Sequence, residues 1–329
     1  MIDIAVFKKQ RASLKSSATQ KIWAFSSLII LVLVFSLSSS NFLRFDNVVG
    51  IMLSTAVIGV LALGSTFVII TGGIDLAVGT VMTFSSVMTG VVITFWHLPV
   101  PLGIVGGIIT GAVCGLISGY AVARMKIPPF IATLAMMMVT KGLSLVISGT
   151  KPIYFNDTPA FGQFSMGSLI AIPGMDIPNA VWIFFGAAII ASLLLTKTII
   201  GRYTFALGSN EEATRLSGVN VCRWKIIVYA LTGVFSGIAG VMMASRLNSA
   251  QPALGQGYEL EAIAAVVIGG TSLSGGQGSI LGTVIGALIM SVLTNGLRIL
   301  SVPQEWQTVI VGIVVMMAVF ADIVRRRKK

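Results

Sequence analysis

The chain has 329 residues, of which 55% are hydrophobic and only 10% are charged, and its formal net charge is +11. Soluble domains carry about 25% charged residues, so this composition excludes an ordinary soluble domain. Apolar runs of about 18 or more residues, the length of a transmembrane helix, recur along the chain, whereas the strands of a membrane β-barrel alternate in short segments. We therefore expect an all-α polytopic membrane protein whose single transmembrane domain covers residues 22–324.

Little in the sequence points to chemistry carried out by this chain itself. The only histidine, His97, excludes a multi-histidine metal site, and the two cysteines, Cys114 and Cys222, are too few for a disulfide framework. There is no G-x-x-x-x-G-K-[ST] phosphate-binding loop and no credible catalytic set. We expect no metal, no cofactor and no enzymatic activity, so that any ATP-driven work is done by another subunit.

Ten apolar segments are predicted to span the membrane. They lie near residues 22–40, 48–70, 76–97, 100–123, 128–148, 179–199, 223–245, 258–270, 279–299 and 304–323. The first can be read as a signal peptide ending at Ser38-Ser39-Ser40, but its long charged region and the many spans that follow favour an uncleaved helix. The segment 258–270 is short and ends at Gly269-Gly270, which indicates a broken or re-entrant element.

Lysine and arginine are divided unevenly between the two sides of this arrangement. If residues 1–21 form a cytoplasmic N-terminal segment, 17 of the 22 basic residues fall in cytoplasmic segments, four fall outside, and Lys141 lies within a span. This bias is the positive-inside signal, and it accounts for the net charge without a nucleic-acid partner. Both termini are then cytoplasmic. The basic tail, residues 325–329, serves as a topology anchor, with contact to anionic membrane lipid as an alternative.

Glycine-rich interruptions of the spans are candidates for a translocation pathway or its gate. The stretch Thr71–Gly79 carries an acid at membrane depth, which is a functional candidate, although Asp75 is also placed to be the N-cap of the third span, the interpretation we favour. Residues 257–278 hold glycines that permit close helix packing and irregular backbone. The fifth span opens with a proline pair, which fixes its entry angle. The candidate pathway residues are Gly72, Gly73, Asp75, Phe130, Thr133, Gly269, Gly270 and Thr271.

The longest segment on the outer side, residues 149–180, is a candidate docking surface. Loops longer than about 15 residues are uncommon unless they are functional or disordered, so docking of an external protein and a passive loop are both open. The candidate docking residues are Lys151 and Asp157, with Glu259 and Glu261 near the outer mouth. For these two glutamates, capping of a helix is an equally favoured alternative to docking.

Residues 201–225 form the longest cytoplasmic connection and read as a short helix with marked ends. Ser209-Asn210-Glu211-Glu212 fits the S-x-x-E capping box with Ser209 as the N-cap, and Gly218 stands where a left-handed C-terminal cap is wanted. About two helical turns are marginal in isolation, so we expect this helix to pack on a partner. The candidate coupling residues are Gly208, Ser209, Asn210, Glu211, Glu212, Arg215 and Gly218.

The same stretch, G-R-Y-x-x-A-L-G-x-N-E-x-A-T-R-L-S-G-V-N-V, resembles the coupling segment of the permease subunits of ABC importers for monosaccharides, most closely ribose permeases. Residues 72–79 are similar to the G-G-I-D-L-S-V-G signature of that family, with Ala77 in place of serine, and residues 257–278 are the densest match. The resemblance implies a permease homodimer in the bacterial inner membrane, a twin-cassette ATPase that receives the short helix, and an external sugar-binding protein. Ribose is the expected sugar; allose, xylose, galactose and signalling furanoses remain open.

Two other functional classes fit the sequence less well. An ion-coupled secondary transporter of a small polar solute commonly places titratable groups near the midplane, but here only Asp75 and Lys141 are candidates, and both lie near span ends. A membrane enzyme or scaffold lacks a catalytic constellation. A neighbouring gene for an ATPase with two phosphate-binding loops would favour the importer.

Overall fold

The computed structural model describes residues 24–169, 171–172 and 175–327. The predicted N-terminal segment 1–21 and the last two residues of the basic tail lie outside the described residues. The described chain is built almost entirely of helices, which confirms the all-α prediction. In chain order these are Ala24–Ser38, α2 (Phe45–Ile70), α3 (Val78–Gly90), the π-helix η1 (Val91–Phe95), α4 (Val100–Ala123), α5 (Pro129–Ser148), α6 (Pro159–Met166), α7 (Asn179–Lys197), α8 (Ile199–Ser209), α9 (Glu211–Leu216), α10 (Val221–Leu247), α11 (Tyr258–Ile268), α12 (Ile280–Ile299) and α13 (Gln304–Arg327).

Each of the ten predicted spans contains a helix. Within the described residues, eight helices are long and apolar enough to cross a membrane. The other two predicted spans, 22–40 and 258–270, correspond to the shorter apolar helix Ala24–Ser38 and to α11, which has 11 residues. The short α11 is followed by a glycine-rich connection to α12, as the sequence indicated. The basic tail is helical as far as Arg327, because α13 continues to that residue.

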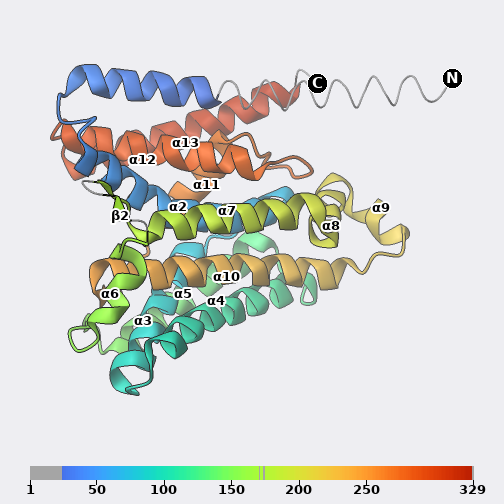
Figure 1. Cartoon of the computed structure of the whole chain (residues 1–329). Helices are drawn as coiled ribbons and strands as arrows, with labels where there is room; N and C mark the ends of the chain where they lie inside the picture. The colour runs from blue at the N-terminus through green and yellow to red at the C-terminus, as the bar shows by residue number, and fades with distance from the viewer. Residues whose placement is uncertain (1–23, 170, 173–174, 328–329) are drawn as a thin grey trace.

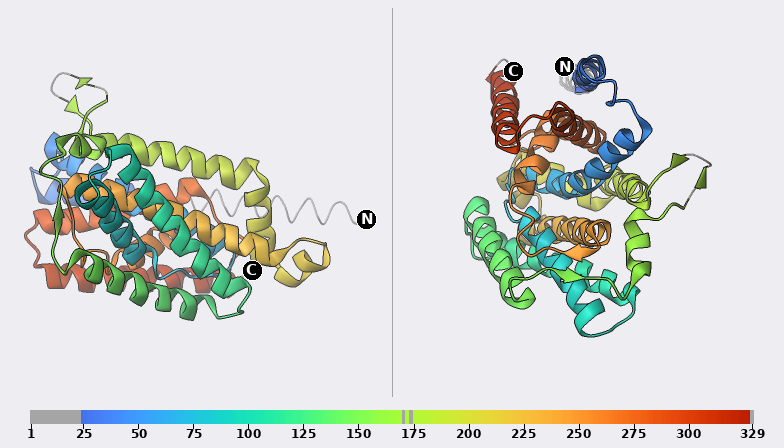
Figure 2. Two further views of the ribbon diagram at one scale, coloured as in Figure 1. Left: turned by 90° about the horizontal axis from the view of Figure 1, so that it is seen from below. Right: turned by 90° about the vertical axis from the view of Figure 1, so that its left-hand side faces the viewer.

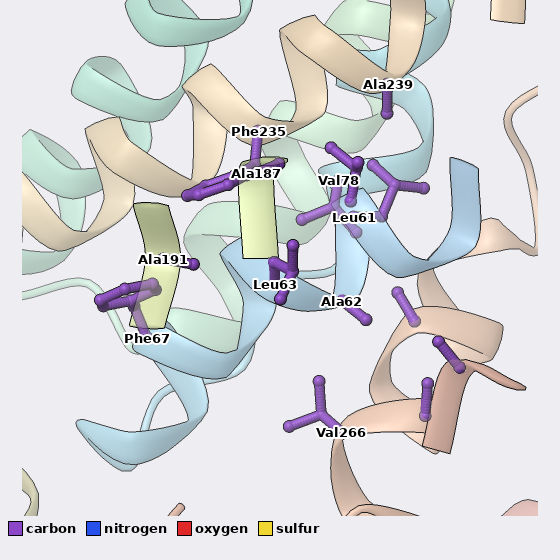
Figure 3. Close-up of a cluster of buried hydrophobic side chains, with 14 of the residues drawn as sticks. Leu61, Ala62, Leu63, Phe67, Val78, Ala187, Ala191, Phe235, Ala239 and Val266 are labelled. Carbon is purple, nitrogen blue, oxygen red and sulfur yellow. The ribbon is translucent and has the colours of Figure 1, made fainter. Parts of the chain in front are cut away.

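Helix α2 lies at the centre of the bundle. Of its most apolar 18-residue stretch 94% is buried, compared with 6% for α13 on the outside. A helix that is hydrophobic all round must be surrounded by other helices, and α2 is contacted by α7, α10, α11 and α12. Figure 3 shows Leu61, Leu63 and Phe67 of α2 gathered with small and aromatic side chains of its neighbours. Seen end on, the long helices run side by side around this core (Figure 2).

Helices α4 and α10 make the most extensive contact between any two described elements, and small residues allow it. A Cβ atom on Gly111 of α4 would overlap the carbonyl oxygen of Gly233 on α10, and a Cβ on Gly233 would overlap that of Gly111. Glycines at i and i+4 on an apolar helix let two backbones approach closely and pack by van der Waals contact. This pair therefore joins the long helix α10 firmly to α4.

Much of the predicted outer loop 149–180 is folded against the end of α10. Strand β1 (Ile153–Tyr154) pairs antiparallel with β4 (Ser249–Ala250), and α6 follows it. The Ser245 hydroxyl donates to the Phe161 carbonyl at 2.6 Å, and the Phe155 and Phe161 rings are buried together. Strands β2 (Ala171–Ile172) and β3 (Met175–Asp176) form a hairpin that projects from the bundle (Figure 2). The first half of this segment is therefore ordered against the bundle, while docking of an external protein there stays a prediction.

The two ends of the bundle are different. At one end lie α6 and the short strands, while α9 protrudes from the other (Figure 1). Helix α10 connects the two ends, because it begins just after α9 and finishes beside β4.

Candidate coupling and translocation site

Helix α9 is the short helix predicted from the sequence, but Asn210 is its N-cap. The Asn210 Oδ1 accepts the Ala213 N–H at 2.9 Å, and the Asn210 backbone is extended, as an N-cap requires. The prediction that Ser209 caps the helix is wrong, because the preceding helix α8 runs through Ser209 and holds its backbone in the helical conformation. The S-x-x-E capping box is therefore not formed.

The C-terminal end of α9 is as predicted. Gly218 has a φ of +82°, and its N–H donates to the Arg215 carbonyl at 3.0 Å, while the Val219 N–H donates to the Thr214 carbonyl at 3.4 Å. These bonds satisfy carbonyl groups that the end of the helix leaves free, and only glycine adopts this conformation without steric cost. Asn220 then caps α10 by accepting the Arg223 N–H at 3.0 Å.

The charges predicted for α9 pair within the segment. Glu212 bonds to Arg215 at 2.5 Å, and Glu211 bonds to Lys225 of α10 at 2.7 Å. The Glu212 carboxylate raises the pKa of Arg215 above its ordinary value through the hydrogen bond and its charge. The sequence analysis considered the charged residues of α9 and did not single out Leu216 at its end, which is 78% exposed. An apolar side chain at the tip of a polar segment is suited to contact with another protein.

Helix α8, which was not predicted as a separate helix, directly precedes α9 and packs against the bundle. The rings of Tyr203 on α8 and Trp224 on α10 lie with centroids 4.7 Å apart. Gly208 lies against the backbone of Ile70 and Gly276, and a Cβ at Gly208 would overlap the Ile70 carbonyl. The Gly276 N–H donates to that same carbonyl at 2.8 Å. Gly208 therefore faces the bundle and joins α8 to the end of α2 and to the α11–α12 connection.

The predicted pathway residues near Asp75 form a buried turn between α2 and α3. The Asp75 Oδ1 accepts the Ala77 N–H at 2.9 Å, and Ala77, rather than Asp75, is the N-cap of α3. The favoured prediction is therefore off by two residues, because the carboxylate closes the turn that leads into the helix. Gly72 has a φ of +80°, and Gly73 lies beside the Tyr229 hydroxyl.

Thr133 of α5 holds this turn in place from the side. Its hydroxyl accepts the Leu76 N–H at 3.1 Å and donates to the Pro129 carbonyl of its own helix at 3.0 Å. Helix α5 begins at Pro129, as the proline pair indicated. Phe130 is not part of this contact, since it is 54% exposed on the surface of the bundle.

The remaining predicted pathway residues lie in the α11–α12 connection. A Cβ on Gly269 would overlap the Gly282 carbonyl of α12, so the predicted close approach is present at this residue. Gly270 has a φ of +91°. Thr271 is buried, and its hydroxyl has no hydrogen-bond partner among the described residues. A Cβ atom added at Gly72 would lie 3.8 Å from the Ser274 carbonyl oxygen of this connection, so the two glycine-rich interruptions lie close together.

The predicted docking residues are at the end of the bundle opposite α9, but only some of them are accessible. Lys151 and Asp157 are exposed. Glu259 is buried, and its carboxylate accepts the Gly257 N–H at 3.0 and 3.1 Å, which matches the capping alternative and leaves no surface for docking in this conformation. Glu261 lines a cavity of about 610 Å³. Across the described residues, no cluster of three or more histidine, cysteine, aspartate or glutamate side chains could hold a metal ion.

Comparison with known proteins places the chain in a permease family. Residues 47–319 match the family described as branched-chain amino acid transport system / permease component. The chain is 45% identical over 304 residues to the ribose import permease protein RbsC of Bacillus subtilis, covering 92% of each chain. It is 40% identical over 299 residues to RbsC of Escherichia coli K12, covering 90% of this chain and 91% of that one.

A more distant relative carries a different sugar in its name. The chain is 36% identical over 301 residues to the L-arabinose ABC transporter permease protein AraH of Azospirillum brasilense, covering 92% of this chain and 87% of that one. No solved structure matches the chain. The extent of the match, from α2 to α13, means that this chain belongs to the permease component family of these transport systems.

Proposed function

We propose that the chain is the membrane permease subunit of an ATP-driven importer for a monosaccharide, with ribose as the sugar. The observation that carries this proposal is the capped helix α9, which protrudes from one end of an apolar bundle (Figure 1) and ends in the exposed Leu216. A two-turn helix of this kind needs a partner to pack on. Two relatives at 40% and 45% identity are named as ribose import permeases, which supports the choice of ribose.

The mechanism requires motion at α9 to reach the residues inside the bundle. Helix α9 is connected directly to α8, and α8 touches the end of α2 and the α11–α12 connection through Gly208. These are backbone contacts in a well-packed region, and packed interiors transmit displacement instead of absorbing it. When a partner ATPase closes and moves α9, the ends of α2 and α12 move with it, and the glycine-rich interruptions change their spacing.

The partners follow from this assignment. A separate twin-cassette ATPase binds α9 in the cytoplasm, and a sugar-binding protein delivers the sugar on the opposite face. Two copies of the permease form the transporter in the bacterial inner membrane, with both termini in the cytoplasm. The chain itself hydrolyses no ATP, because its sequence has no phosphate-binding loop.

The test is to purify the complete complex, reconstitute it in lipid vesicles, and measure ATP hydrolysis and sugar uptake with its loaded binding protein. We expect ribose to stimulate hydrolysis and to be imported only when ATP is present. Stimulation by arabinose or another sugar alone would change the substrate but keep the class. Uptake driven by an ion gradient without ATP would favour a secondary transporter and would overturn the proposal.

A further inference from the structure

A large cavity lined by both charged and apolar side chains lies far from α9 within the single chain. Its volume is about 610 Å³, and its walls are residues of α2, α10, α11, α12 and α13 together with the turn before α11. We call it the distal cavity. Arg246, one of its lining residues, lies 25 residues along α10 from Val221, which is roughly 40 Å at 1.5 Å per residue. The distal cavity is therefore at the end of the bundle opposite the proposed ATPase contact.

Some of the charged side chains that line the distal cavity are held only loosely by the fold. Within the part of the chain that the structure describes, neither Arg298 nor Glu261 makes an ion pair or a side-chain hydrogen bond, although both line this cavity. Among the described residues, the Arg246 guanidinium donates one hydrogen bond, a long one of 3.4 Å to the Leu53 carbonyl. Arg298 is exposed to the distal cavity and Glu261 is half-buried in its wall, and charged groups that line a cavity at membrane depth commonly mark a substrate pathway.

The balance of charge in the distal cavity indicates the class of ligand. The positive charges of Arg246 and Arg298 disfavour binding of a cation in the cavity, and the negative charge of Glu261 disfavours binding of an anion. A neutral molecule with many hydroxyl groups is repelled by neither charge. It can accept hydrogen bonds from the guanidinium groups and donate hydrogen bonds to the carboxylate. Gln256, Tyr258 and Gln304 add further polar groups to the walls.

The size and the apolar wall of the distal cavity also fit a small sugar. Ligand sites in proteins occupy about 300–1,000 Å³ and are mostly apolar with a few placed polar groups. Here Val57 and Ile58 of α2 and Val311 and Val315 of α13 line the cavity and provide apolar surface for the C–H faces of a sugar ring. The charged groups of the lining lie near the ends of their helices. The hydroxyl groups of one ligand can therefore meet these charged groups while its C–H groups meet the apolar side chains.

We propose that the distal cavity is a binding site for a neutral monosaccharide, occupied by the sugar before it crosses the membrane. This inference rests on the proposed function, and it names the part of the chain that meets the substrate. Arg246 and Arg298 donate hydrogen bonds to sugar oxygens, and Glu261 accepts from sugar hydroxyls. The glycine-rich interruptions, by contrast, are at the α9 end of α2 and α12.

The first test uses the complete complex in lipid vesicles with Glu261→Gln and, separately, Arg298→Gln. Loss of one hydrogen bond to a charged group lowers the uptake rate by about tenfold or more, while the affinity of the loaded binding protein for the complex stays the same. Glu305→Gln and Arg44→Gln are the matched controls, because both side chains are exposed near the same end and neither lines the distal cavity. The controls are expected to import at the wild-type rate.

The second test reads occupancy directly and needs only a mild change. Thr308 lines the distal cavity and bonds only to its own helix, so Thr308→Cys is expected to fold. A high concentration of ribose should slow the reaction of this cysteine with a small thiol reagent severalfold, whereas it should not slow reaction of a cysteine placed at Asn156. Equal rates for Thr308→Cys with and without ribose would overturn the inference.

Two other outcomes separate the inference from the function on which it rests. Wild-type import by both Glu261→Gln and Arg298→Gln would overturn the sugar site alone, as would a loss of binding-protein affinity in those variants, because it would assign these residues to docking. A wild-type complex that hydrolyses ATP but imports no monosaccharide would overturn the proposed function and the sugar site with it.

Discussion

Gly208 of α8 and Ile70, the last residue of α2, are in direct backbone contact, and the Ile70 carbonyl also accepts the Gly276 N–H at 2.8 Å. One carbonyl group therefore joins three segments that are far apart in the sequence. A side chain at Gly208 would meet main-chain atoms on both sides, and these cannot turn away as a flexible side chain can. This contact is the only place in our proposed mechanism where α8 acts on both glycine-rich interruptions.

The first prediction concerns this contact. Gly208→Ala is expected to separate α8 from α2, because overpacking a close contact costs about 1–3 kcal/mol and forces the backbone to shift. The complex should still assemble, but sugar uptake per ATP hydrolysed should fall by severalfold in reconstituted vesicles. The matched control is Gly186→Ala on α7, where a Cβ meets nothing within 4 Å. Equal coupling in the two variants would show that α8 does not transmit motion through Gly208.

The second prediction concerns the α11–α12 connection. Gly270 has a φ of +91°, and a residue with a Cβ in that region is strained by about 1–3 kcal/mol. Gly270→Leu is therefore expected to reduce uptake strongly even where the complex assembles, because the leucine forces the connection beside Gly269 and Gly282 out of its native conformation. Gly142→Leu on α5 introduces the same side chain where a Cβ meets nothing within 4 Å, and it should import normally. Normal uptake by Gly270→Leu would show that this conformation is not needed for transport.

The positions of the helices could be predicted from the sequence, because hydropathy alone decides which segments enter a membrane. The ends of the short helices could not. Ser209 and Asn210 are both good N-caps, and the choice between them depends on where α8 ends, which the local pattern does not reveal. Asp75 was expected to be the N-cap of α3, but it lies two residues before the cap and closes the turn that leads into the helix.

The tertiary contacts explain most of the remaining differences. Glu259 is a charged residue next to an outer loop in the sequence, yet it is buried, and Gly79 of α3 packs closely against it. The pairing of β1 with β4 joins residues about 100 positions apart, and the distal cavity is assembled from the ends of several helices. No local pattern contains these relations. The pathway and gate roles of the glycine-rich residues remain predictions.

The third prediction concerns topology. The uneven distribution of lysine and arginine places residue 156 outside the cell membrane and residue 210 in the cytoplasm. Both asparagines are exposed, so a difference in reactivity reports the side of the membrane and not burial. A membrane-impermeant thiol reagent added to intact cells should modify Asn156→Cys and spare Asn210→Cys, and permeabilised cells should show both. Modification of Asn210→Cys alone in intact cells would reverse the arrangement.

The fourth prediction separates the two candidate caps of α9. Asn210→Ala removes the bond to the Ala213 N–H and should destabilise α9 by about 1 kcal/mol, whereas Ser209→Ala removes no capping bond and should have little effect on it. Because the long apolar helices dominate stability, both variants should insert normally. Hydrogen exchange of the α9 amides is the measurement, and faster exchange is expected only in Asn210→Ala. The reverse result would restore Ser209 as the cap.

The last prediction concerns the acidic start of α9. Glu211 and Glu212 stand in its first turn, where negative charge is favoured by the positive end of the helix dipole. Each is half or more exposed and pairs with a basic residue, and such exposed pairs contribute only about 0–1 kcal/mol to stability. Reversing both charges, Glu211→Lys with Glu212→Lys, should therefore leave membrane insertion and dimerisation intact but oppose a basic surface on the ATPase.

We expect the double variant to bind its ATPase poorly or to hydrolyse ATP without importing sugar, as measured by pull-down of the ATPase together with uptake in vesicles. Glu305→Lys makes a similar charge change at the other end of the bundle and should have no effect on either measurement. Glu211→Gln with Glu212→Gln removes both ion pairs without adding positive charge, so an intermediate defect would show that repulsion contributes. If the reversed variant binds and imports at wild-type levels, these acids are not in the coupling contact, and the exposed Leu216, with Arg215 and Asn210, becomes the surface to test.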